Sequence, residues 1–533
     1  MAFAEDSIDA FATHLERPLA KGHTPERAIT GAAGGAACGD LIRISLVIDG
    51  KSLEGRILDV GFDAHGCGAS IAAGSATVAL VRGQPLLDAA RVGSEQIAGE
   101  LGGLSEAKLH AAELASDALH RALGLAARRQ ARLADSDARA VVAMSGGVDS
   151  AVAALLTMRG GAEAVGVTLE LWADEQNDAQ RSCCSAQAVR SARSLAHSLG
   201  LPHLSIDLRE EFRAGVVEPW LADHAAGLTP YPCVRCNGEV RLDGMLELAQ
   251  RLGSQTLVTG HYARVADVHM CTSGESRMRD SRGSACAPPG SAACGAAADI
   301  ACDVGPPAAD PLLQVAVDEG KDQSYALASL APGSLARLRF PLGGMRKQEV
   351  RALAREAGLV VARRPDSQDL CFLAGTDQRA FLARHGGLGA RSGEIVDPEG
   401  EVLGGHQGAH GFTIGQRRGL GLGGGEPRFV LATDIDANTV TVGPRERLHT
   451  REVEVRDVTL RRDGGCVDAV KIRYRGRRLG CTIQNAAAGS HERLLVKLSD
   501  PIERTAPGQL ACLYCGDLLV GHGTIVANAA ASG

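Results

Sequence analysis

The stretch "VVAMSGGVDSAVAALLTM", residues 141–158, decides the fold of the middle of this chain. Its first four residues are apolar and predict a buried strand, and the apolar run after Asp149 predicts a helix. The turn between them, Ser145–Ser150, contains two adjacent glycines, which let the backbone approach a ligand closely. The free N–H groups at the start of the helix suit a phosphate, the two serines add hydroxyl donors, and Asp149 could orient a magnesium ion. The G-K-[ST] signature of a Walker loop is absent.

Outward from this loop, the sequence alternates strand and helix patterns. Short apolar runs recur at 139–144, 162–171, 202–208 and 254–260, with helical patterns between them. This alternation is typical of a parallel α/β sheet. We therefore expect an α/β nucleotide-binding domain over residues 139–340.

The composition of the whole chain limits the classes of protein it can be. At 533 residues it is too long for one core, and 45% hydrophobic with 22% charged residues is typical of a globular protein. The net charge of −7 means that a nucleic-acid partner would need a locally basic face. No run of 18 apolar residues is present and the N-terminus is acidic, so we expect no membrane partner and a cytoplasmic location. In such a reducing compartment, the fifteen cysteines are better candidates for metal or catalytic roles than for disulfides.

Four further segments flank or interrupt the α/β region. Residues 1–125 form an N-terminal block that ends in an amphipathic helix, and 126–138 are polar and predict a linker. In that helix Leu114, Ala115, Ala118, Leu119 and Ala122 share one face, opposite His110, Glu113, Asp117 and Arg121. Residues 267–312 are rich in Gly, Ala, Ser and Pro and predict a disordered insertion. We expect a small central domain over 341–405 and an antiparallel β-barrel over 406–533, where short alternating runs are separated by turns.

The "SGGVDS" order resembles the pyrophosphate loop of the N-type ATP pyrophosphatases, which cleave ATP to AMP and pyrophosphate. Seven motifs that follow it resemble, in order, those of the tRNA-specific 2-thiouridylases. They are "TPYPCVRCN" (229–237), "TGHYAR" (259–264), "KDQSYAL" (321–327), "DSQDLCFLAG" (366–375), "GFTIGQRRGLGL" (411–422), "KIRYR" (471–475) and "PGQLACLY" (507–514). The resemblance implies an ATP- and Mg²⁺-dependent enzyme that adenylates the C2 oxygen of the wobble uridine, position 34, of tRNA and replaces it with sulfur. The implied partners are tRNA and a cysteine desulfurase or another sulfur donor.

The same resemblance implies roles for particular residues. Cys236 would be the nucleophile, and Cys371 would carry the persulfide; thiolates suit both tasks. The residues implied to bind ATP are Ala143, Met144, Ser145, Gly146, Gly147, Val148, Asp149, Ser150, Leu169 and Gly260. The residues implied to contact tRNA are Tyr231, Pro232, Cys233, His261, Lys321, Asp322, Gln323, Arg473, Tyr474 and Gln509. Two positions depart from the family pattern: Tyr231 replaces the usual Asn, and Cys233 stands where many members have Asp.

The N-terminal block resembles the IscU/NifU-type iron–sulfur scaffolds. The motifs are "AACGD" (36–40), "GCGASIAAGS" (66–75) and "KLHAAELASDAL" (108–119). The resemblance implies a site of Cys38, Asp40, Cys67 and His110, which is a donor set that suits zinc or iron. Ala111 stands where the family has its third cysteine.

The pair Cys233-x-x-Cys236 keeps three interpretations open. With Cys371 it could hold a [4Fe–4S] cluster with one iron open to bind a sulfide. Alternatively, Cys236 and Cys371 work as a persulfide–disulfide pair, with Cys233 a bystander, or the pair holds a structural zinc ion. Two alternative functions also stay open: a pyrophosphate-loop tRNA thiolase with a different target base, and a non-enzymatic iron–sulfur or sulfur carrier with a regulatory nucleotide domain.

Overall fold

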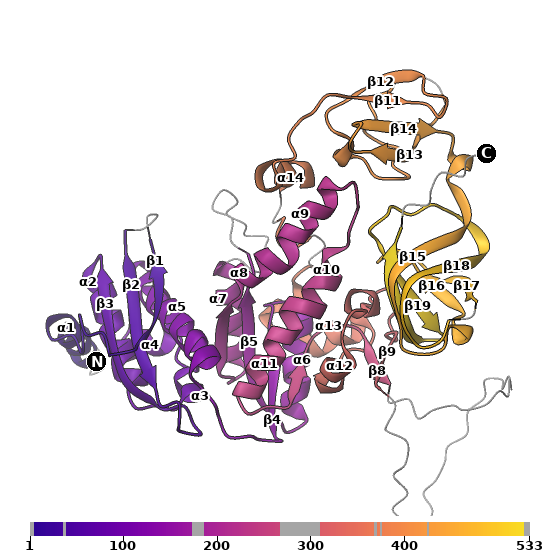
Figure 1. Cartoon of the computed structure of the whole chain (residues 1–533). Coiled ribbons are helices and arrows are strands. Elements are labelled where there is room, and N and C mark those ends of the chain that lie inside the picture. Colours follow the sequence, from indigo (N-terminus) through magenta and orange to yellow (C-terminus); the bar gives the residue numbers. More distant parts are fainter. Residues whose placement is uncertain are drawn as a thin grey trace, which may run out of the picture.

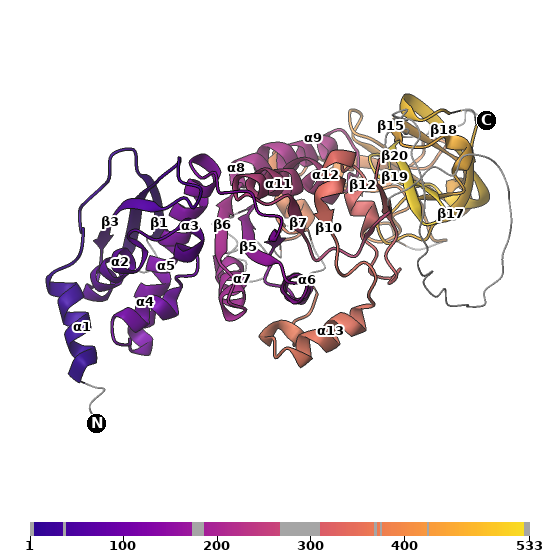
Figure 2. The same cartoon turned by 90° about the horizontal axis from the view of Figure 1, so that it is seen from below.

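The computed structural model describes residues 5–35, 39–172, 186–266, 310–366, 370–373, 376–423, 426–484 and 486–526. The predicted insertion falls almost wholly on 267–309 and so lies outside the described residues, as does Cys38. Figures 1 and 2 show the chain arranged in a row, from an N-terminal unit through a central α/β unit to two β-rich units. No helix within the described ranges is long and apolar enough to cross a membrane.

The N-terminal unit is a three-stranded antiparallel sheet, ordered β1-β2-β3, with helices packed against it. Its long last helix, α5, contacts β1, β2 and α2. The elements are α1 (Glu5–Glu16), β1 (Ile29–Gly34), β2 (Leu41–Ile48), β3 (Ile57–His65), α2 (Gly68–Val81), α3 (Leu86–Ala89), α4 (Ser94–Glu100) and α5 (Glu106–Arg129).

Helix α5 confirms the predicted amphipathic face and corrects the predicted linker. Leu114, Ala115, Ala118, Leu119 and Ala122 are all at most 2% exposed. The linker expected over 126–138 is wrong at its start, because α5 continues to Arg129. The apolar stripe continues through the fully buried Ala126 and Ala127, so the two arginines that made this stretch look polar lie on a helix with a buried face.

The central unit is built on a five-stranded parallel sheet, ordered β10-β7-β4-β5-β6, as the alternating pattern predicted. Each expected apolar run contains a strand. Its elements are β4 (Arg139–Ala143), α6 (Val148–Arg159), β5 (Glu163–Glu170), α7 (Ala186–Ser198), β6 (His203–Asp207), α8 (Arg209–Phe212), η1 (Arg213–Val217), α9 (Glu218–Ala225), α10 (Pro232–Arg235), η2 (Cys236–Arg241), α11 (Leu242–Arg251), β7 (Thr256–Val258), η3 (Ser324–Leu327), α12 (Pro332–Arg337), β10 (Leu338–Arg339), α13 (Lys347–Glu356), η4 (Val360–Arg363) and α14 (Gln378–Gly386).

The N-terminal unit docks on the edge strand of this parallel sheet through α5. A Cβ atom built on Gly124 would lie 1.9 Å from the carbonyl oxygen of Ser205 in β6, so only glycine allows this approach. Asp117 of α5 forms ion pairs with Arg190 and Arg193 of α7. The buried side chains of the two units form one continuous core. The fused unit is therefore an integral part of the fold, because it covers an edge that would otherwise be open.

The interface also contains three histidines, of which His120 and His203 are fully buried and His197 is half-buried. The ring of His120 on α5 lies 5.5 Å from the ring of His197 and 5.9 Å from that of His203, between centroids. Its two ring nitrogens lie 2.9 Å from the carbonyl oxygen of His203 and 3.0 Å from that of Val92. Burial lowers the pKa of all three imidazoles, that of His197 to about 4. Burial therefore favours the neutral form of these rings, although in that form His120 can donate to only one of its two carbonyl oxygens.

The two β-rich units differ from the expected division at residue 405/406. A four-stranded sheet, ordered β12-β11-β14-β13, runs across that position, because β11 pairs with both β12 and β14. Residues 429–443, expected in the barrel, therefore belong to this sheet. Its elements are β11 (Gly393–Val396), β12 (Val402–His406), η5 (Ala409–Gly411), β13 (Phe429–Asp434) and β14 (Thr439–Gly443).

The C-terminal unit is the predicted antiparallel barrel. Strands β15, β18, β17, β16, β19 and β20 follow one another, and pairing between β15 and β20 closes the ring. Two short strands from the central region, β8 (Arg264–Ala266) and β9 (Leu312–Gln314), extend this sheet beyond β20. The remaining elements are η6 (Arg445–Leu448), β15 (His449–Leu460), η7 (Gly464–Cys466), β16 (Ala469–Lys471), β17 (Leu479–Ile483), β18 (Gly489–Glu503), β19 (Leu510–Cys515) and β20 (Leu518–Ile525).

Candidate functional site

The predicted phosphate loop joins β4 to α6 at the carboxyl end of the parallel sheet. Gly146 has φ +70°, a left-handed conformation that favours glycine. The Ser150 hydroxyl accepts a hydrogen bond from the Ser145 backbone N–H at 3.1 Å and donates one to the Gly147 carbonyl at 3.1 Å. These bonds hold the turn closed around the first turn of α6, where backbone N–H groups face a potential anion.

Gly260, predicted to lie near the nucleotide, lies against the back of this loop. A Cβ atom built on it would be 2.8 Å from both the Asp149 carbonyl carbon and the Ser150 nitrogen. Leu169, the other residue predicted from outside the loop, lies near the end of β5 and is only 6% exposed. Gly260 therefore supports the loop through close backbone packing.

Asp149 lies at the centre of an ion-pair network at the mouth of the loop. Its two carboxylate oxygens accept hydrogen bonds from Lys347 Nζ at 2.7 and 2.8 Å, and the Tyr262 hydroxyl donates a third at 3.0 Å. Lys347 Nζ also lies 2.9 Å from Asp366. Neither Lys347 nor Tyr262 was identified from the sequence. Tyr262 lies within the "TGHYAR" motif. Lys347 lies outside all the quoted motifs, and no pattern in the sequence around it marks it as part of a site.

Asp366 connects this network to two more motifs. Its carboxylate accepts from Lys321 Nζ at 2.8 Å and from Arg351 at 2.8 Å. Burial alone would raise the pKa of Asp366, but hydrogen bonds from Lys321 and Lys347 lower it to about 2. The structure thus joins the "SGGVDS", "KDQSYAL" and "DSQDLCFLAG" motifs through side-chain contacts.

The C-x-x-C motif lies on a short helix that the "KDQSYAL" segment supports. Tyr231 precedes α10, and Cys236 is the first residue of the π-helical turn η2. The Asn237 side-chain amide donates to the Ala326 carbonyl at 3.2 Å, and the Ser329 hydroxyl donates to the Val234 carbonyl at 3.1 Å. Cys236 is only 9% exposed, whereas Cys233 is half-buried.

Tyr231, where the family has Asn, forms an aromatic cluster beside Cys233. Its ring stacks on that of Tyr474, with centroids 5.0 Å apart and planes at 19°, and meets Tyr325 edge-on at 5.6 Å. Burial, followed by the neighbouring Cys233 with its hydrogen bond to Tyr231, raises the pKa of the Tyr231 phenol. Two residues predicted to contact tRNA, Tyr231 and Tyr474, are thereby brought together from separate units.

Cys371 lies on a segment anchored by its neighbour. Phe372 packs against Trp220 and Phe212, with ring centroids 5.2 and 6.1 Å apart. The same run of helices, α8 and η1, contacts η2, which begins at Cys236. One helical run therefore supports both cysteines that the resemblance marked as reactive.

Several other residues predicted to contact tRNA are engaged within the protein. Asp322, 7% exposed, pairs with the buried Lys471 at 3.4 Å, and the ring of His261 bonds to Thr259. The Gln323 side chain accepts from the Tyr262 N–H at 3.0 Å. Arg473 donates to the Thr505 hydroxyl at 2.8 Å, and the Gln509 amide donates to the Thr229 carbonyl. Lys321 is the partner of Asp366 described above, and Pro232 is buried at the start of α10.

In the N-terminal unit, the predicted metal ligands Asp40 and Cys67 are in contact. The Cys67 N–H and the Ser70 hydroxyl donate to the Asp40 carboxylate at 3.0 and 3.1 Å, and the Cys67 sulfur lies 3.5 Å from it. Burial raises the pKa of Asp40, but these bonds outweigh burial and lower it. His110 Nε2 is buried without a hydrogen-bond partner in the described part of the chain. Ala111, which replaces the family's third cysteine, is buried.

No group of three or more His, Cys, Asp or Glu side chains within the described ranges is arranged to hold a metal ion. This statement covers Cys233, Cys236 and Cys371, which are all described. It also covers Asp40, Cys67 and His110, but not Cys38. A pre-formed cluster or zinc site at the C-x-x-C motif is therefore not what the structure presents.

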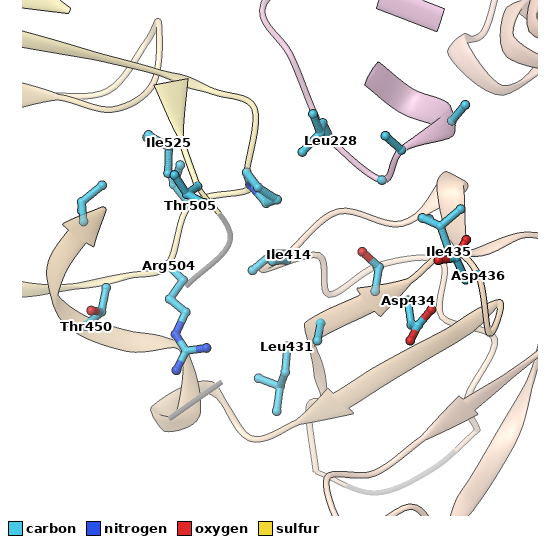
Figure 3. A pocket seen from close by; sticks show the side chains of 18 of the residues that line it. Leu228, Ile414, Leu431, Asp434, Ile435, Asp436, Thr450, Arg504, Thr505 and Ile525 are labelled. Carbon is cyan, nitrogen blue, oxygen red and sulfur yellow. The ribbon is translucent and has the colours of Figure 1, made fainter. Parts of the chain in front are cut away.

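A cavity of about 580 Å³ lies where the central, four-stranded and barrel units meet (Figure 3). Leu228 lines it from the segment before the C-x-x-C motif, Ile435 from the four-stranded sheet, and Arg504 and Ile525 from the barrel. Asp434 and Asp436 make part of its wall acidic. None of its lining residues belongs to the phosphate loop or is one of the three cysteines, so the cavity is separate from the ion-pair network.

Profiles of four known families match the chain in succession. Residues 8–132 match the NifU-like N terminal domain, and 138–284 with 298–375 match the tRNA methyl transferase HUP domain. Residues 379–444 match the tRNA methyl transferase PRC-barrel domain, and 462–525 the aminomethyltransferase beta-barrel domain.

Curated relatives match over nearly their whole lengths. The bifunctional protein NifU/MnmA of Rubrobacter xylanophilus is 39% identical over 525 residues, which cover 96% of this chain and 97% of that protein. The tRNA-specific 2-thiouridylase MnmA of Acidithiobacillus ferrooxidans is 39% identical over 395 residues, 73% of this chain and 99% of that protein. The enzyme of the same name from Heliobacterium modesticaldum is 37% identical over 395 residues, 73% of this chain and 92% of that protein.

Proposed function

Because the chain belongs to the family of the tRNA-specific 2-thiouridylases, here fused to a NifU-like domain, we propose that it thiolates C2 of the wobble uridine of tRNA at the site built around Asp149 and Cys236. The chain is an enzyme of tRNA modification, and its ATP-binding domain implies ATP as a substrate. Membership of an enzyme family removes the alternative of a purely non-enzymatic carrier.

The observation that carries the proposal is the contact of three motifs at one point. Lys347 joins Asp149 of the phosphate loop to Asp366, which also binds Lys321 of the "KDQSYAL" motif. The same "KDQSYAL" segment holds the helix of Cys236 through Asn237. The phosphate loop and the helix of Cys236 thus belong to one connected framework, which supports adenylation followed by sulfur transfer at this site.

In the first step, the C2 oxygen of the uridine attacks the α-phosphate of ATP, and pyrophosphate leaves. The N–H groups at the start of α6 and the hydroxyl of Ser145 would bind the phosphates, while the Ser150 hydroxyl holds the loop closed. Asp149 and Asp366 fit a magnesium ion, because oxygen donors from one or two carboxylates are what that ion takes beside phosphate. Magnesium would supply charge neutralisation of the leaving pyrophosphate.

In the second step, the outer sulfur of a persulfide on Cys371 attacks C2, and AMP leaves. The Cys236 thiolate then attacks the inner sulfur, which is the Cys371 Sγ, and breaks the S–S bond to the transferred sulfur. This leaves 2-thiouridine and a Cys236–Cys371 disulfide, which a dithiol reductant returns to two thiols. The support of both cysteines by the helical run of Phe212 and Trp220 favours this pairing.

The proposed steps use the thiols of Cys236 and Cys371 and no cluster or zinc ion at the C-x-x-C motif. The described cysteines form no prearranged metal group, and Cys233 interacts with the Tyr231 hydroxyl. The persulfide–disulfide interpretation is therefore the best supported of the three, with Cys233 as a neighbour of Tyr231.

Three serine variants of the full-length protein test this assignment. Cys236→Ser and Cys371→Ser should each lower 2-thiouridine formation by about 100-fold or more, because each removes a required sulfur, while tRNA-dependent pyrophosphate release continues. Cys233→Ser should keep more than about a third of the thiolation rate. Nucleoside mass spectrometry and a pyrophosphate assay measure the two steps separately. A protein purified anaerobically that binds iron and loses both iron and thiolation in Cys233→Ser would instead establish the cluster interpretation.

We also propose a source for the persulfide sulfur and a metal site in the N-terminal unit. We expect the persulfide to come from a cysteine desulfurase in the cytoplasm, since the reactive thiols need a reducing compartment. In the N-terminal unit, Cys67, Asp40 and His110 are not arranged around one point, so a zinc or iron ion would require these side chains to move together, with Cys38 as a further donor. Metal analysis of the purified protein against Cys67→Ser tests this site, and equal metal content would reject it.

A further inference from the structure

Lys347 reaches the phosphate loop from a distant part of the chain. It is the first residue of α13, and its backbone N–H donates to Asp318 at 2.9 Å, which fixes the start of that helix. Its side chain is only 11% exposed and its ammonium lies 5.7 Å from the centre of the Tyr262 ring. The ammonium is therefore held in one place rather than extended into solvent.

That place lies between two carboxylates. Nζ is 2.7 and 2.8 Å from the two oxygens of Asp149 and 2.9 Å from Asp366. A cation between carboxylate oxygens from two segments occupies the kind of position that a divalent ion takes when nucleotide is bound. Asp149 itself is 32% exposed and thus accessible to an incoming ion.

The surroundings carry more positive than negative charge. Lys321, Lys347 and Arg351 all pair with Asp366, and Arg364 donates to the Gly146 carbonyl of the loop at 3.1 Å. Four cationic side chains thus lie around this point with three carboxylates, those of Asp149, Asp366 and Asp318. This excess suits a polyphosphate better than a simple structural ion pair.

We propose that Lys347 is a nucleotide-binding residue of this enzyme, which holds Asp149 and Asp366 together before ATP binds and transfers its hydrogen bonds to phosphate oxygens of the pyrophosphate moiety when Mg²⁺–ATP enters. The proposal rests on the phosphate loop being the ATP site, as proposed above. A lysine ammonium is a compact charge that binds phosphate from any side, so it can move from carboxylate to phosphate by small rotations of its side chain. Its release leaves the two carboxylates available to the metal ion.

The test is equilibrium binding to the full-length protein, measured by calorimetry with Mg²⁺–ATP, Mg²⁺–pyrophosphate and AMP. In Lys347→Met, the affinity for pyrophosphate and ATP should fall about tenfold or more, since a hydrogen bond to a charged group is lost. The affinity for AMP should change less than about twofold, because AMP lacks the pyrophosphate moiety. Lys347→Gln keeps a donor for Asp149 and should show the same loss, which covers the case in which Lys347→Met does not fold.

Arg355→Met is the matched control. Arg355 lies on the same helix, but it is exposed and its guanidinium donates to the Arg351 carbonyl at 3.1 Å instead of to a carboxylate of the network. Its pyrophosphate affinity should stay within about threefold of the wild type. Equal losses in Arg355→Met and Lys347→Met, or an unchanged pyrophosphate affinity in folded Lys347→Gln, would overturn the role of Lys347. A wild-type protein that binds neither ATP nor pyrophosphate would instead overturn the ATP site itself.

Discussion

Among single residues, Gly260 shows how little space the phosphate loop leaves behind it. In Gly260→Ala the new methyl group would press on the backbone of Asp149 and Ser150, which cannot move aside as a side chain can. We expect ATP affinity to fall about tenfold or more, because the loop must shift and its backbone N–H groups would no longer be aligned with the phosphate oxygens. Calorimetry with ATP checks this, and Gly333→Ala, where a Cβ atom meets nothing within 4 Å, should bind normally. Equal ATP affinities in both variants would show that the contact is not needed.

Asp322 yields a second prediction at this scale. The family resemblance implies that Asp322 contacts tRNA, but its side chain is buried and paired with Lys471 of the barrel. Asp322→Ala should lower the free energy of unfolding by about 3 kcal/mol, because it leaves a buried ammonium without its partner. Glu399→Ala, which breaks an exposed pair with Arg447, should cost less than about 1 kcal/mol. Thermal unfolding curves separate the two, and an unchanged curve for Asp322→Ala would restore it as a candidate for tRNA contact.

At the scale of elements, the contact of α5 with β6 depends on one small residue. Gly124→Ala should push the helix away from the Ser205 carbonyl and destabilise the protein by roughly 2 kcal/mol or more, as overpacking does. Gly99→Ala, in α4 with nothing within 4 Å, should be neutral or stabilise by up to about 1 kcal/mol through helix propensity. Differential scanning calorimetry measures both changes. A Gly124→Ala protein as stable as the wild type would mean that α5 and β6 can separate without loss.

The sequence predicted the elements better than their partners. The parallel sheet, the phosphate loop and the apolar face of α5 follow from local patterns of apolar residues, which report burial directly. The end of α5 was missed because Arg128 and Arg129 look like a linker, whereas one of them donates to the Asp207 carbonyl of another unit. Lys347 was missed for a similar reason: its partner Asp149 lies 198 positions away, and one sequence holds no record of such a contact. The domain boundary expected at 405/406 is wrong because the alternation of apolar and polar residues in a strand does not indicate which other strand it pairs with.

At the scale of the whole molecule, the histidine cluster between the N-terminal and central units predicts how the stability of the protein depends on pH. His120, His197 and His203 have lower pKa values in the folded protein than the usual 6.5, chiefly through burial. Protonation therefore favours the unfolded or separated state, so stability should be complete above about pH 6.5 and decline as the pH falls towards 4. We expect the melting temperature to drop by roughly 5 °C or more between pH 7.5 and 5.

His197→Gln provides the control for this pH dependence. The His197 ring bonds to the Ala90 carbonyl at 3.0 Å, and a glutamine amide can donate the same bond without titrating. The variant should lose part of the acid sensitivity while its melting temperature at pH 7.5 changes little. A wild-type melting temperature that is the same at pH 7.5 and 5 would show that the three rings are not what limits stability in acid.

The antiparallel pairing of β8 with β9 has a use in protein engineering. Ala266 is paired with Leu312, and β9 is in turn paired with β20 of the barrel. The residues on either side of 267–309 are therefore neighbours in one sheet, so the span to be bridged is fixed by the pairing of β8 with β9 and not by what is inserted between them. A short turn in place of 267–309, or a fluorescent reporter or affinity tag inserted there, should therefore leave the path of the flanking strands unchanged.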